Sequence, residues 1–186
     1  KGCAPFDGLA ERCDLEFPAF NTLPVACIAA PDAALLPRVP GLADDLFQSD
    51  GTMTKQEVRA ATLAKLMPMR GALLWDIGCG SGSVAIEWMR AARYARAIGI
   101  EPRADRRAMA GANALALGAP KLELVEGSVP EALDGLTPPD ASFIGGGLSH
   151  DTFNAAWAAL RPLGRVAANA VTLESEAVLM DLHARH

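Results

Sequence analysis

The stretch LLWDIGCGSG, residues 73–82, decides the fold that we expect for this chain. Its apolar run ends at Asp76 and then opens into a loop with a glycine at every second position. Beyond the loop, apolar residues recur over 84–92 at the spacing of one helix face. This order of strand, tight turn and helix predicts the opening of a βαβ unit that binds a nucleotide.

The glycine spacing separates two kinds of nucleotide loop. A dinucleotide-binding loop spaces its glycines as G-x-G-x-x-G, whereas Gly78, Gly80 and Gly82 follow Asp76 with single residues between them. This E/D-x-G-x-G-x-G pattern resembles the first motif of the class I S-adenosylmethionine-dependent methyltransferases. An ordinary glycine-rich turn and an NAD site are the alternatives at this point.

A second acidic residue strengthens the first interpretation. Glu101 ends the next expected strand, residues 97–101, about 20 residues after the loop, where a ribose-binding carboxylate belongs. The resemblance implies S-adenosylmethionine as the cofactor, with the adenine near the turn at Gly127 and Ser128. The residues expected to bind this cofactor are Thr54, Asp76, Gly78, Cys79, Gly80, Ser81, Gly82, Glu101, Gly127 and Ser128.

Composition restricts the class of protein. The 186 residues are 51% hydrophobic and carry a net charge of −5, which predicts a globular domain. Without a run of Lys or Arg we expect no nucleic-acid partner, and without an apolar run of about 20 residues we expect no membrane span. The four cysteines lack metal-ligand spacing, so we expect no metal, reduced thiols and a cytoplasmic location.

The chain divides into two parts of different composition. Residues 1–42 contain six of the 13 prolines and three of the four cysteines, and we expect them to be the tail of a preceding domain plus a linker. Residues 43–186 are the expected methyltransferase domain. It begins with a predicted capping box at residues 54–57, with Thr54 as the N-cap of a helix whose apolar face includes Val58.

The rest of the domain alternates strands and helices. We expect further strands at 122–127, 141–144 and 165–171, and helices after Pro102, Pro130 and Ser149 and over 173–183. Five strands that alternate with helices predict an α/β fold with a doubly wound, mostly parallel sheet. The class I methyltransferase fold normally adds an antiparallel C-terminal hairpin, and residues for that hairpin are missing.

Several segments carry a narrower resemblance. The runs DDLF (44–47), MTKQEVR (53–59) and GSVPEAL (127–133), with the glycines at 145–147, resemble the decarboxylating precorrin C15-methyltransferases of cobalamin biosynthesis. The resemblance implies methylation of C15 of a precorrin-6B-type tetrapyrrole and decarboxylation of its ring C acetate. The chain departs from the family pattern in the loop after the fourth strand, where a serine is frequent and this chain reads GGGL (145–148).

Residue roles and partners follow from this resemblance. We expect Lys55 and His150 to be catalytic, and the substrate to bind at Arg59, Gly145, Gly146 and Gly147. In some members the domain follows an upstream domain that methylates C5, so we expect such a domain as a partner, and a homo-oligomer. The alternatives are a class I methyltransferase acting on another small molecule or a tRNA base, and a cofactor-binding scaffold that has lost catalysis.

Overall fold

The structure is a computed structural model that describes residues 28, 31, 33 and 35–185. Leu36–His186 form one compact unit. Most of the segment expected to be the tail of a preceding domain, residues 1–27, 29–30, 32 and 34, lies outside the described residues. Among the described helices, none combines the length and the apolar composition that crossing a membrane requires.

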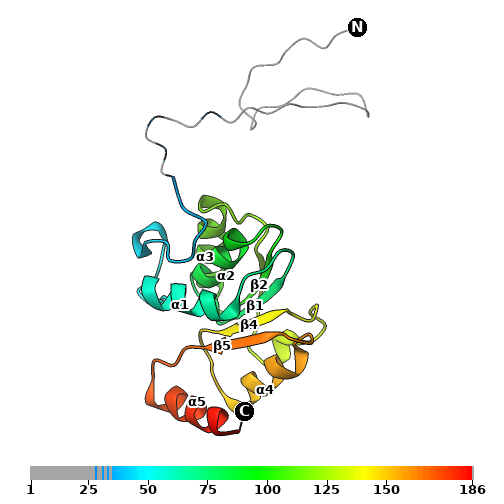
Figure 1. The fold of residues 1–186 in the computed structure, drawn as a ribbon. Coiled ribbons are helices and arrows are strands. Elements are labelled where there is room, and N and C mark those ends of the chain that lie inside the picture. Colours follow the sequence, from blue (N-terminus) through cyan, green and yellow to red (C-terminus); the bar gives the residue numbers. More distant parts are fainter. Residues whose placement is uncertain (1–27, 29–30, 32, 34, 186) are drawn as a thin grey trace. The chain divides into compact units, whose positions relative to one another are not determined.

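The unit is built on one parallel sheet, as the sequence predicts (Figure 1). The strand order is β3-β2-β1-β4-β5. The chain runs outward from β1 to β3 and then returns to the other side of β1, so the carboxyl ends of β1 and β4 form the crevice in which such sheets bind ligands. The strands are β1 (Leu73–Ile77), β2 (Arg96–Ile100), β3 (Glu123–Val125), β4 (Ala141–Ile144) and β5 (Arg165–Ala168).

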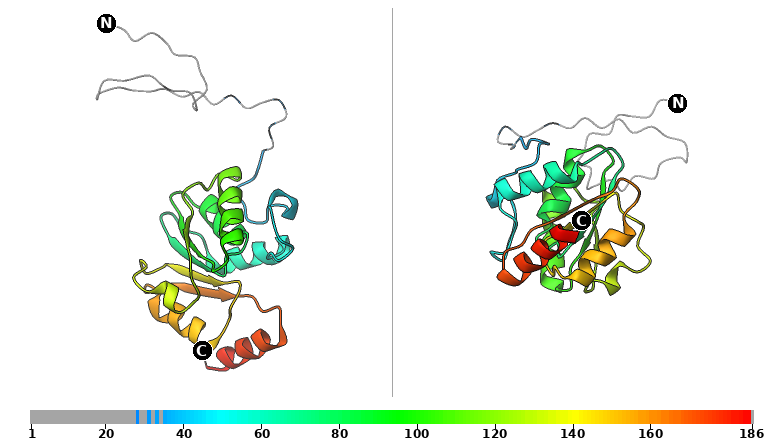
Figure 2. Two further views of the ribbon diagram at one scale, coloured as in Figure 1. Left: turned by 180° about the vertical axis from the view of Figure 1, so that it is seen from behind. Right: turned by 60° about the horizontal axis from the view of Figure 1, so that its bottom comes forward.

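Helices cover both faces of the sheet (Figure 2). One face carries α1 (Gln56–Leu66), α2 (Ser83–Ala91) and α3 (Ala104–Ala116); the other carries α4 (His150–Ala159) and α5 (Leu173–Arg185). Two short 3-10 helices, η2 (Asp44–Leu46) and η3 (Glu131–Leu133), complete the elements.

Strand β1 lies at the centre of the core, and all five of its residues are buried. Successive side chains of a strand point to opposite faces. Leu74 therefore packs toward α1 and α2, whereas Trp75 and Ile77 pack toward Phe153 on α4. Two covered faces require a strand that is apolar on both sides, and in β1 Asp76 is the exception.

Two local predictions from the sequence are confirmed. Strand β4 occupies residues 141–144, and the Ser149 hydroxyl accepts a hydrogen bond from the Thr152 N–H at 3.1 Å as the N-cap of α4. Strand β5 ends at Ala168, three residues earlier than expected. After β5 the described chain contains α5 and no further strand.

The prediction of a capping box at residues 54–57 is wrong. The N-cap of α1 is Lys55, and no side chain caps the helix. The Thr54 carbonyl instead accepts a hydrogen bond from Arg59 at 2.6 Å. Val58, expected in the core, is 48% exposed, and Arg59 with 0% exposure takes the buried position on this helix.

A buried ion-pair network explains this arrangement. Arg59 Nε donates to Glu87 on α2 at 2.5 Å, and Arg59 Nη1 donates to Asp44 at 2.9 Å. Arg59 Nη2 donates to the Leu42 carbonyl. A buried charge is tolerated only when it is paired and hydrogen-bonded, and these contacts satisfy the guanidinium. The network fixes the segment before α1 onto both helices.

The same network bears on the domain boundary. The backbone N–H groups of Gly41 and Leu42 donate to the Glu87 carboxylate at 2.5 and 3.0 Å. Leu42 is buried beside Phe47 and Ile86. Residues 36–42, which the sequence assigned to the leading segment, therefore pack with the methyltransferase unit. The origin of the residues before them remains a prediction.

Candidate functional site

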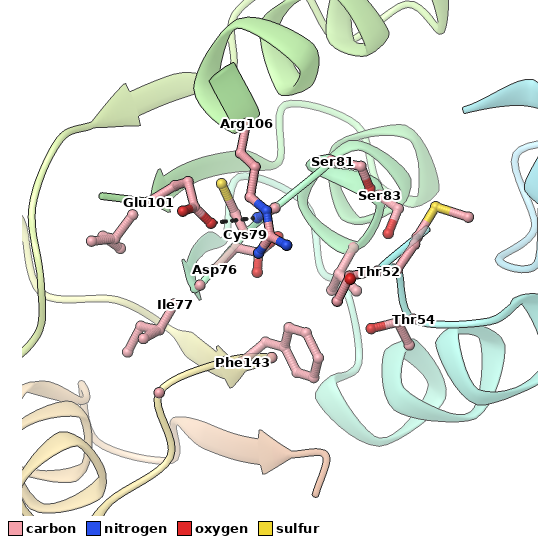
Figure 3. A pocket seen from close by; sticks show the side chains of 18 of the residues that line it. Thr52, Thr54, Asp76, Ile77, Cys79, Ser81, Ser83, Glu101, Arg106 and Phe143 are labelled. Atoms are coloured by element: carbon pink, nitrogen blue, oxygen red, sulfur yellow. Dashed lines mark hydrogen bonds between the residues drawn. The ribbon is translucent and has the colours of Figure 1, made fainter. Parts of the chain in front are cut away.

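A cavity of about 620 Å³ opens at the carboxyl ends of the strands. It lies at the crevice between β1 and β4, which is the expected ligand site of this topology. Figure 3 shows its wall, with Glu101 and Ile77 on one side, Thr52 and Thr54 on the other, and Phe143 between them.

The glycine loop after β1 forms the centre of the cavity wall. Gly78 and Gly80 have φ angles of 70° and 54°, a left-handed backbone that favours glycine. A Cβ atom on Gly78 would lie 2.8 Å from the Gly146 nitrogen and 2.9 Å from its Cα atom. At Gly78 the close approach that demands glycine is therefore to the backbone of the β4 loop, within the protein itself.

Gly82 does not line the cavity, in contrast to the prediction that it binds the cofactor. Its φ angle is 76°, and a Cβ atom there would lie 3.1 Å from the Ala110 Cβ atom on α3. The third glycine of the motif is thus explained by close packing of the start of α2 against the middle of α3.

Cys79 lines the cavity as a small buried residue. The Cys79 sulfur packs against Gly99. A Cβ atom added to Gly99 would lie only 2.8 Å from that sulfur. Burial, and secondarily the charges of Asp76 and Glu101, raise the pKa of the Cys79 thiol well above its usual range. The thiol stays protonated at neutral pH and is no nucleophile.

Glu101 projects into the cavity from the end of β2 and is only 3% exposed. Its Oε2 atom accepts from the Gly80 N–H at 3.1 Å (Figure 3). Its Oε1 atom accepts from the Arg103 N–H at 3.1 Å. A carboxylate offers about four acceptor positions, so each oxygen keeps capacity for a ligand hydroxyl. Two backbone donors fix the carboxylate beside the glycine loop.

Asp76 is the second carboxylate of the site and is 1% exposed. Its Oδ2 atom accepts from the Ala85 N–H at 2.9 Å, whereas Oδ1 has no hydrogen-bond partner in the described part of the chain. Burial, with a smaller contribution from the charge of Glu101, raises the pKa of Asp76 to about 7. An unpartnered buried carboxylate oxygen in a cavity wall suits a cationic group.

The segment before α1, in which the sequence analysis singled out Thr54 and Lys55 as site residues, closes one side of the cavity. Thr52, Met53, Thr54 and Lys55 line the cavity, and the Thr52 carbonyl lies 3.9 Å from the Cβ position of Gly80. We call residues 49–54 the strap. Arg59 holds its C-terminal end, and its N-terminal end continues from Gln48, which Asn113 on α3 holds through two hydrogen bonds.

The substrate residues expected at the far end of the cavity fall into two groups. Lys55, Gly145, Gly146 and Gly147 line it, and Lys55 has no ion-pair partner among the described residues. Arg59 does not line it, because its guanidinium is consumed in the buried network. We therefore reassign Arg59 from substrate contact to structural anchor.

His150 also lies outside the cavity lining. Its Nε2 atom is 2.7 Å from the Asp181 carboxylate on α5. The expected catalytic role of His150 is thus not supported by its position, which instead links α4 to α5. Gly127 and Ser128 line the cavity, and their contact with the adenine stays a prediction. No group of three or more potential metal ligands occurs in residues that the structure describes.

The sheet order, the glycine loop and the acidic residue that ends β2 define a class I S-adenosylmethionine-dependent methyltransferase fold. An O-methyltransferase from Thermotoga maritima, described as S-adenosylmethionine-dependent, shares this fold with a TM-score of 0.64 and 20% identity, covering 72% of this chain and 51% of that one. More particularly, the chain belongs to the family described as the precorrin methyltransferase domain, whose model matches residues 45–186.

Individual relatives support the same family assignment. The C-terminal domain of precorrin-6Y C5,15-methyltransferase from Rhodobacter capsulatus superposes with a TM-score of 0.76 at 51% identity, covering 81% of this chain and 82% of that one. A decarboxylating precorrin-6Y C(5,15)-methyltransferase from Sinorhizobium is 52% identical over 166 residues, covering 89% of this chain and 40% of the relative. This chain thus spans less than half the length of that relative.

A shorter relative matches over most of its length. The probable cobalt-precorrin-6B C(15)-methyltransferase (decarboxylating) of Pyrobaculum calidifontis is 37% identical over 141 residues. The match covers 73% of this chain and 72% of the relative. The domain described here therefore also occurs in a protein of much the same size.

Proposed function

We propose that this chain is an S-adenosylmethionine-dependent C-methyltransferase that methylates C15 of a precorrin-6B-type tetrapyrrole and decarboxylates its ring C acetate in cobalamin biosynthesis. The observation that carries the proposal is a single cavity joining two different halves. One half, at β1 to β3, has the groups that a nucleoside and an amino acid require. The other half, at β4 and β5, is lined by glycine backbone and by Lys55.

The cofactor half fits S-adenosylmethionine. Glu101 has acceptor capacity for the ribose hydroxyls, and Asp76 Oδ1 offers a buried anionic partner to the ammonium of the methionine part. Gly80 and Ser81 supply loop backbone, Thr54 lies on the strap side, and Gly127 and Ser128 would lie along the adenine. When bound, the cofactor supplies a methyl group already activated by its positively charged sulfur.

The substrate half suits a large anionic ligand. A cavity of about 620 Å³ falls in the usual range for small-molecule sites, so the reacting edge of a broad tetrapyrrole would enter it while the rest lies at the mouth. The substrate carries many carboxylates and the protein has a net charge of −5. Lys55 is the lining cation left unpaired, since Asp50 and Asp105 engage Arg103 and Arg106 in the described chain.

The chain's contribution to the chemistry is alignment and charge placement. The described residues of the cavity include no nucleophile paired with a base, and its one thiol is protonated. Holding the reacting carbon in line with the activated methyl group supplies much of a rate enhancement of this kind. Decarboxylation breaks the bond to the carboxylate carbon, leaves the electron pair in the conjugated ring system, takes up one proton from solvent and releases CO₂.

The longer relatives suggest the setting in which this activity operates. Their name assigns methylation at both C5 and C15 to one protein, and this chain corresponds to 40% of the length of the Sinorhizobium relative. We include in the proposal an upstream C5-methylating domain as the partner in the same polypeptide.

The test is direct assay of the chain with precorrin-6B and S-adenosylmethionine, followed by mass spectrometry of the products. We expect a product that has gained a methyl group and lost CO₂, together with S-adenosylhomocysteine. A product with neither change, from a chain that binds S-adenosylhomocysteine normally, would overturn the substrate assignment and leave the cofactor assignment in place.

A further inference from the structure

Asn169, which the sequence analysis did not single out, lines the substrate half of the cavity. Its backbone N–H donates to the Ile144 carbonyl at 3.2 Å, which extends the pairing of β4 with β5 by one residue. Asn169 therefore lies beside the start of the glycine run at Gly145. In the order β3-β2-β1-β4-β5, it is three strands away from Glu101, or roughly 14 Å at the usual strand spacing. This position separates it from the ribose site.

The Asn169 side chain is held from outside the cavity. Its Nδ2 atom lies 3.2 Å from the Thr62 hydroxyl, and the same hydroxyl lies 3.4 Å from Asn169 Oδ1. Thr62 is buried on α1 and does not line the cavity. A partner 107 residues earlier in the sequence thus fixes the orientation of the amide.

This anchoring leaves the amide with unused hydrogen-bonding capacity. A primary carboxamide has two N–H donors and two acceptor lone pairs, and one hydroxyl can engage at most two of these four. The described chain offers the side chain no other hydrogen-bond partner. Nearby lining residues are Phe143, Val171 and glycine backbone, so a polar atom of the ligand is the natural partner for the remaining N–H.

We propose that Asn169 binds and orients the carboxylate that the reaction removes. This inference rests on the proposed function and deepens it. A full positive charge beside this carboxylate would add a Coulomb attraction that stabilises the ground state, and that stabilisation is lost as the negative charge disappears with CO₂. A neutral amide orients the group with less of that penalty. Lys55 then receives carboxylates that the reaction retains.

The experiment compares three chains of the full 186 residues: wild type, Asn169→Asp and Thr62→Val. The aspartate has nearly the same shape as Asn169, but its negative charge repels the substrate carboxylate and it lacks the two N–H donors of the amide. The valine keeps the volume of Thr62 and frees the amide without changing it. CO₂ release and the KM for precorrin-6B are measured per folded molecule, and S-adenosylhomocysteine affinity is measured by calorimetry. Asn169→Ser replaces Asn169→Asp if circular dichroism shows the aspartate variant to be unfolded.

We expect Asn169→Asp to lower CO₂ release at least about tenfold, because losing a hydrogen bond to the substrate has an effect of at least this size. The same variant should raise the KM. Thr62→Val should change both quantities in the same direction but less, and S-adenosylhomocysteine affinity should stay within about twofold in all three chains. Unchanged CO₂ release in folded Asn169 variants would overturn the inference while the proposed function stands. A wild-type chain that releases no CO₂ from precorrin-6B would remove both.

Discussion

The Asp50 carboxylate lies 2.7 Å from Arg106 Nη2 and accepts a further bond from Arg106 Nε at 2.9 Å. This pair joins the strap to α3 across the cofactor half of the cavity (Figure 3 shows Arg106 at the cavity wall). The hydrogen bond from Arg106, followed by that from the Thr52 N–H, lowers the pKa of Asp50. Buried side chains hold both ends of the strap. The exposed Asp50–Arg106 pair is therefore the contact that can break while the two ends stay in place.

The first prediction concerns that pair. Asp50→Asn should weaken S-adenosylhomocysteine binding about two- to fivefold and raise its dissociation rate, the scale of an exposed ion pair. High salt should reduce the difference between variant and wild type, because salt screens exposed charges. Stopped-flow release of the cofactor product measures both effects. Asp105→Asn removes an ion-pair partner of Arg103 that does not itself line the cavity; this variant is the control and should release the product at the wild-type rate.

The second prediction concerns the ribose site. Glu101→Gln should cost about 1.5–3 kcal/mol of cofactor affinity, because hydrogen bonds to a charged group contribute on this scale. Titration calorimetry should therefore show Kd rising about 10- to 100-fold. Glu126→Gln changes an exposed acid that pairs with Arg107 and should leave Kd unchanged. Equal affinity in the Glu101 variant and wild type would remove the ribose assignment.

The third prediction concerns pH and Asp76. The folded chain holds the Asp76 proton up to about pH 7, whereas the unfolded chain releases it near the ordinary value of 3.8. The folded state therefore binds more protons between these values, and without cofactor its stability from this group falls as pH rises through that window, by up to about 1.4 kcal/mol per pH unit. Asp76→Asn should remove this component of the slope in denaturant unfolding.

Cofactor binding should depend on pH in the opposite direction. If the ammonium of the ligand pairs with ionised Asp76, S-adenosylhomocysteine affinity should fall by up to about tenfold per pH unit below pH 7. Calorimetry in buffers of different ionisation enthalpy should detect the proton released on binding. The same pH dependence in Asp76→Asn would show that another group is responsible.

The fourth prediction concerns the domain boundary. A truncated chain that begins at Leu36 should unfold at the temperature of the full chain. One that begins at Ala43 loses the Gly41 and Leu42 donors of the buried Glu87 carboxylate, at about 1.5–3 kcal/mol for each hydrogen bond to a charged group. Thermal unfolding by circular dichroism should show a clear drop in Tm. Equal Tm values for the two truncated chains would show that residues 36–42 contribute nothing.

The fifth prediction concerns the β4 loop. A Cβ atom at Gly146 would meet only ordinary contacts, at 3.8 Å from the Gly78 Cα atom. Gly146→Val should therefore fold and bind S-adenosylhomocysteine, yet lose more than about tenfold in product formation, equivalent to about 1.4 kcal/mol on the barrier, because its side chain occupies substrate space. Normal turnover would move the substrate away from this loop. Gly78→Ala is the contrasting variant and should impair cofactor binding too.

Local patterns in the sequence predicted much of the fold. The strand over 141–144, the cap at Ser149 and the carboxylate at Glu101 each depend on residues close together in the chain, so periodicity and spacing are sufficient. The parallel sheet follows from the alternation of strands and helices. The same reasoning found the glycine loop, of which Gly78, Cys79, Gly80 and Ser81 line the cavity.

Contacts between distant residues account for what the sequence could not predict. From the sequence alone Arg59 is expected at the surface. In the fold it is buried and pairs with Glu87, which lies 28 residues later in the chain. Asp50 and Arg106 are 56 residues apart, and Asn169 and Thr62 are 107 apart. Thr54 has the right neighbours for a cap, but the buried guanidinium takes its carbonyl. In each case a tertiary partner overrides a sound local interpretation.

The contact between Gly78 and Gly146 changes what the glycine motif can tell about descent. Part of the motif is required by the crossing of two loops, and another part, Gly82, by the fit of one helix against another. A duplicated copy that lost catalysis but kept another role of the fold would still retain these glycines, because without them it could not fold. Retention of the loop is therefore evidence for the architecture, whereas a side chain without an ion-pair partner in the described chain, such as that of Lys55, can reveal whether a descendant has stopped working as an enzyme.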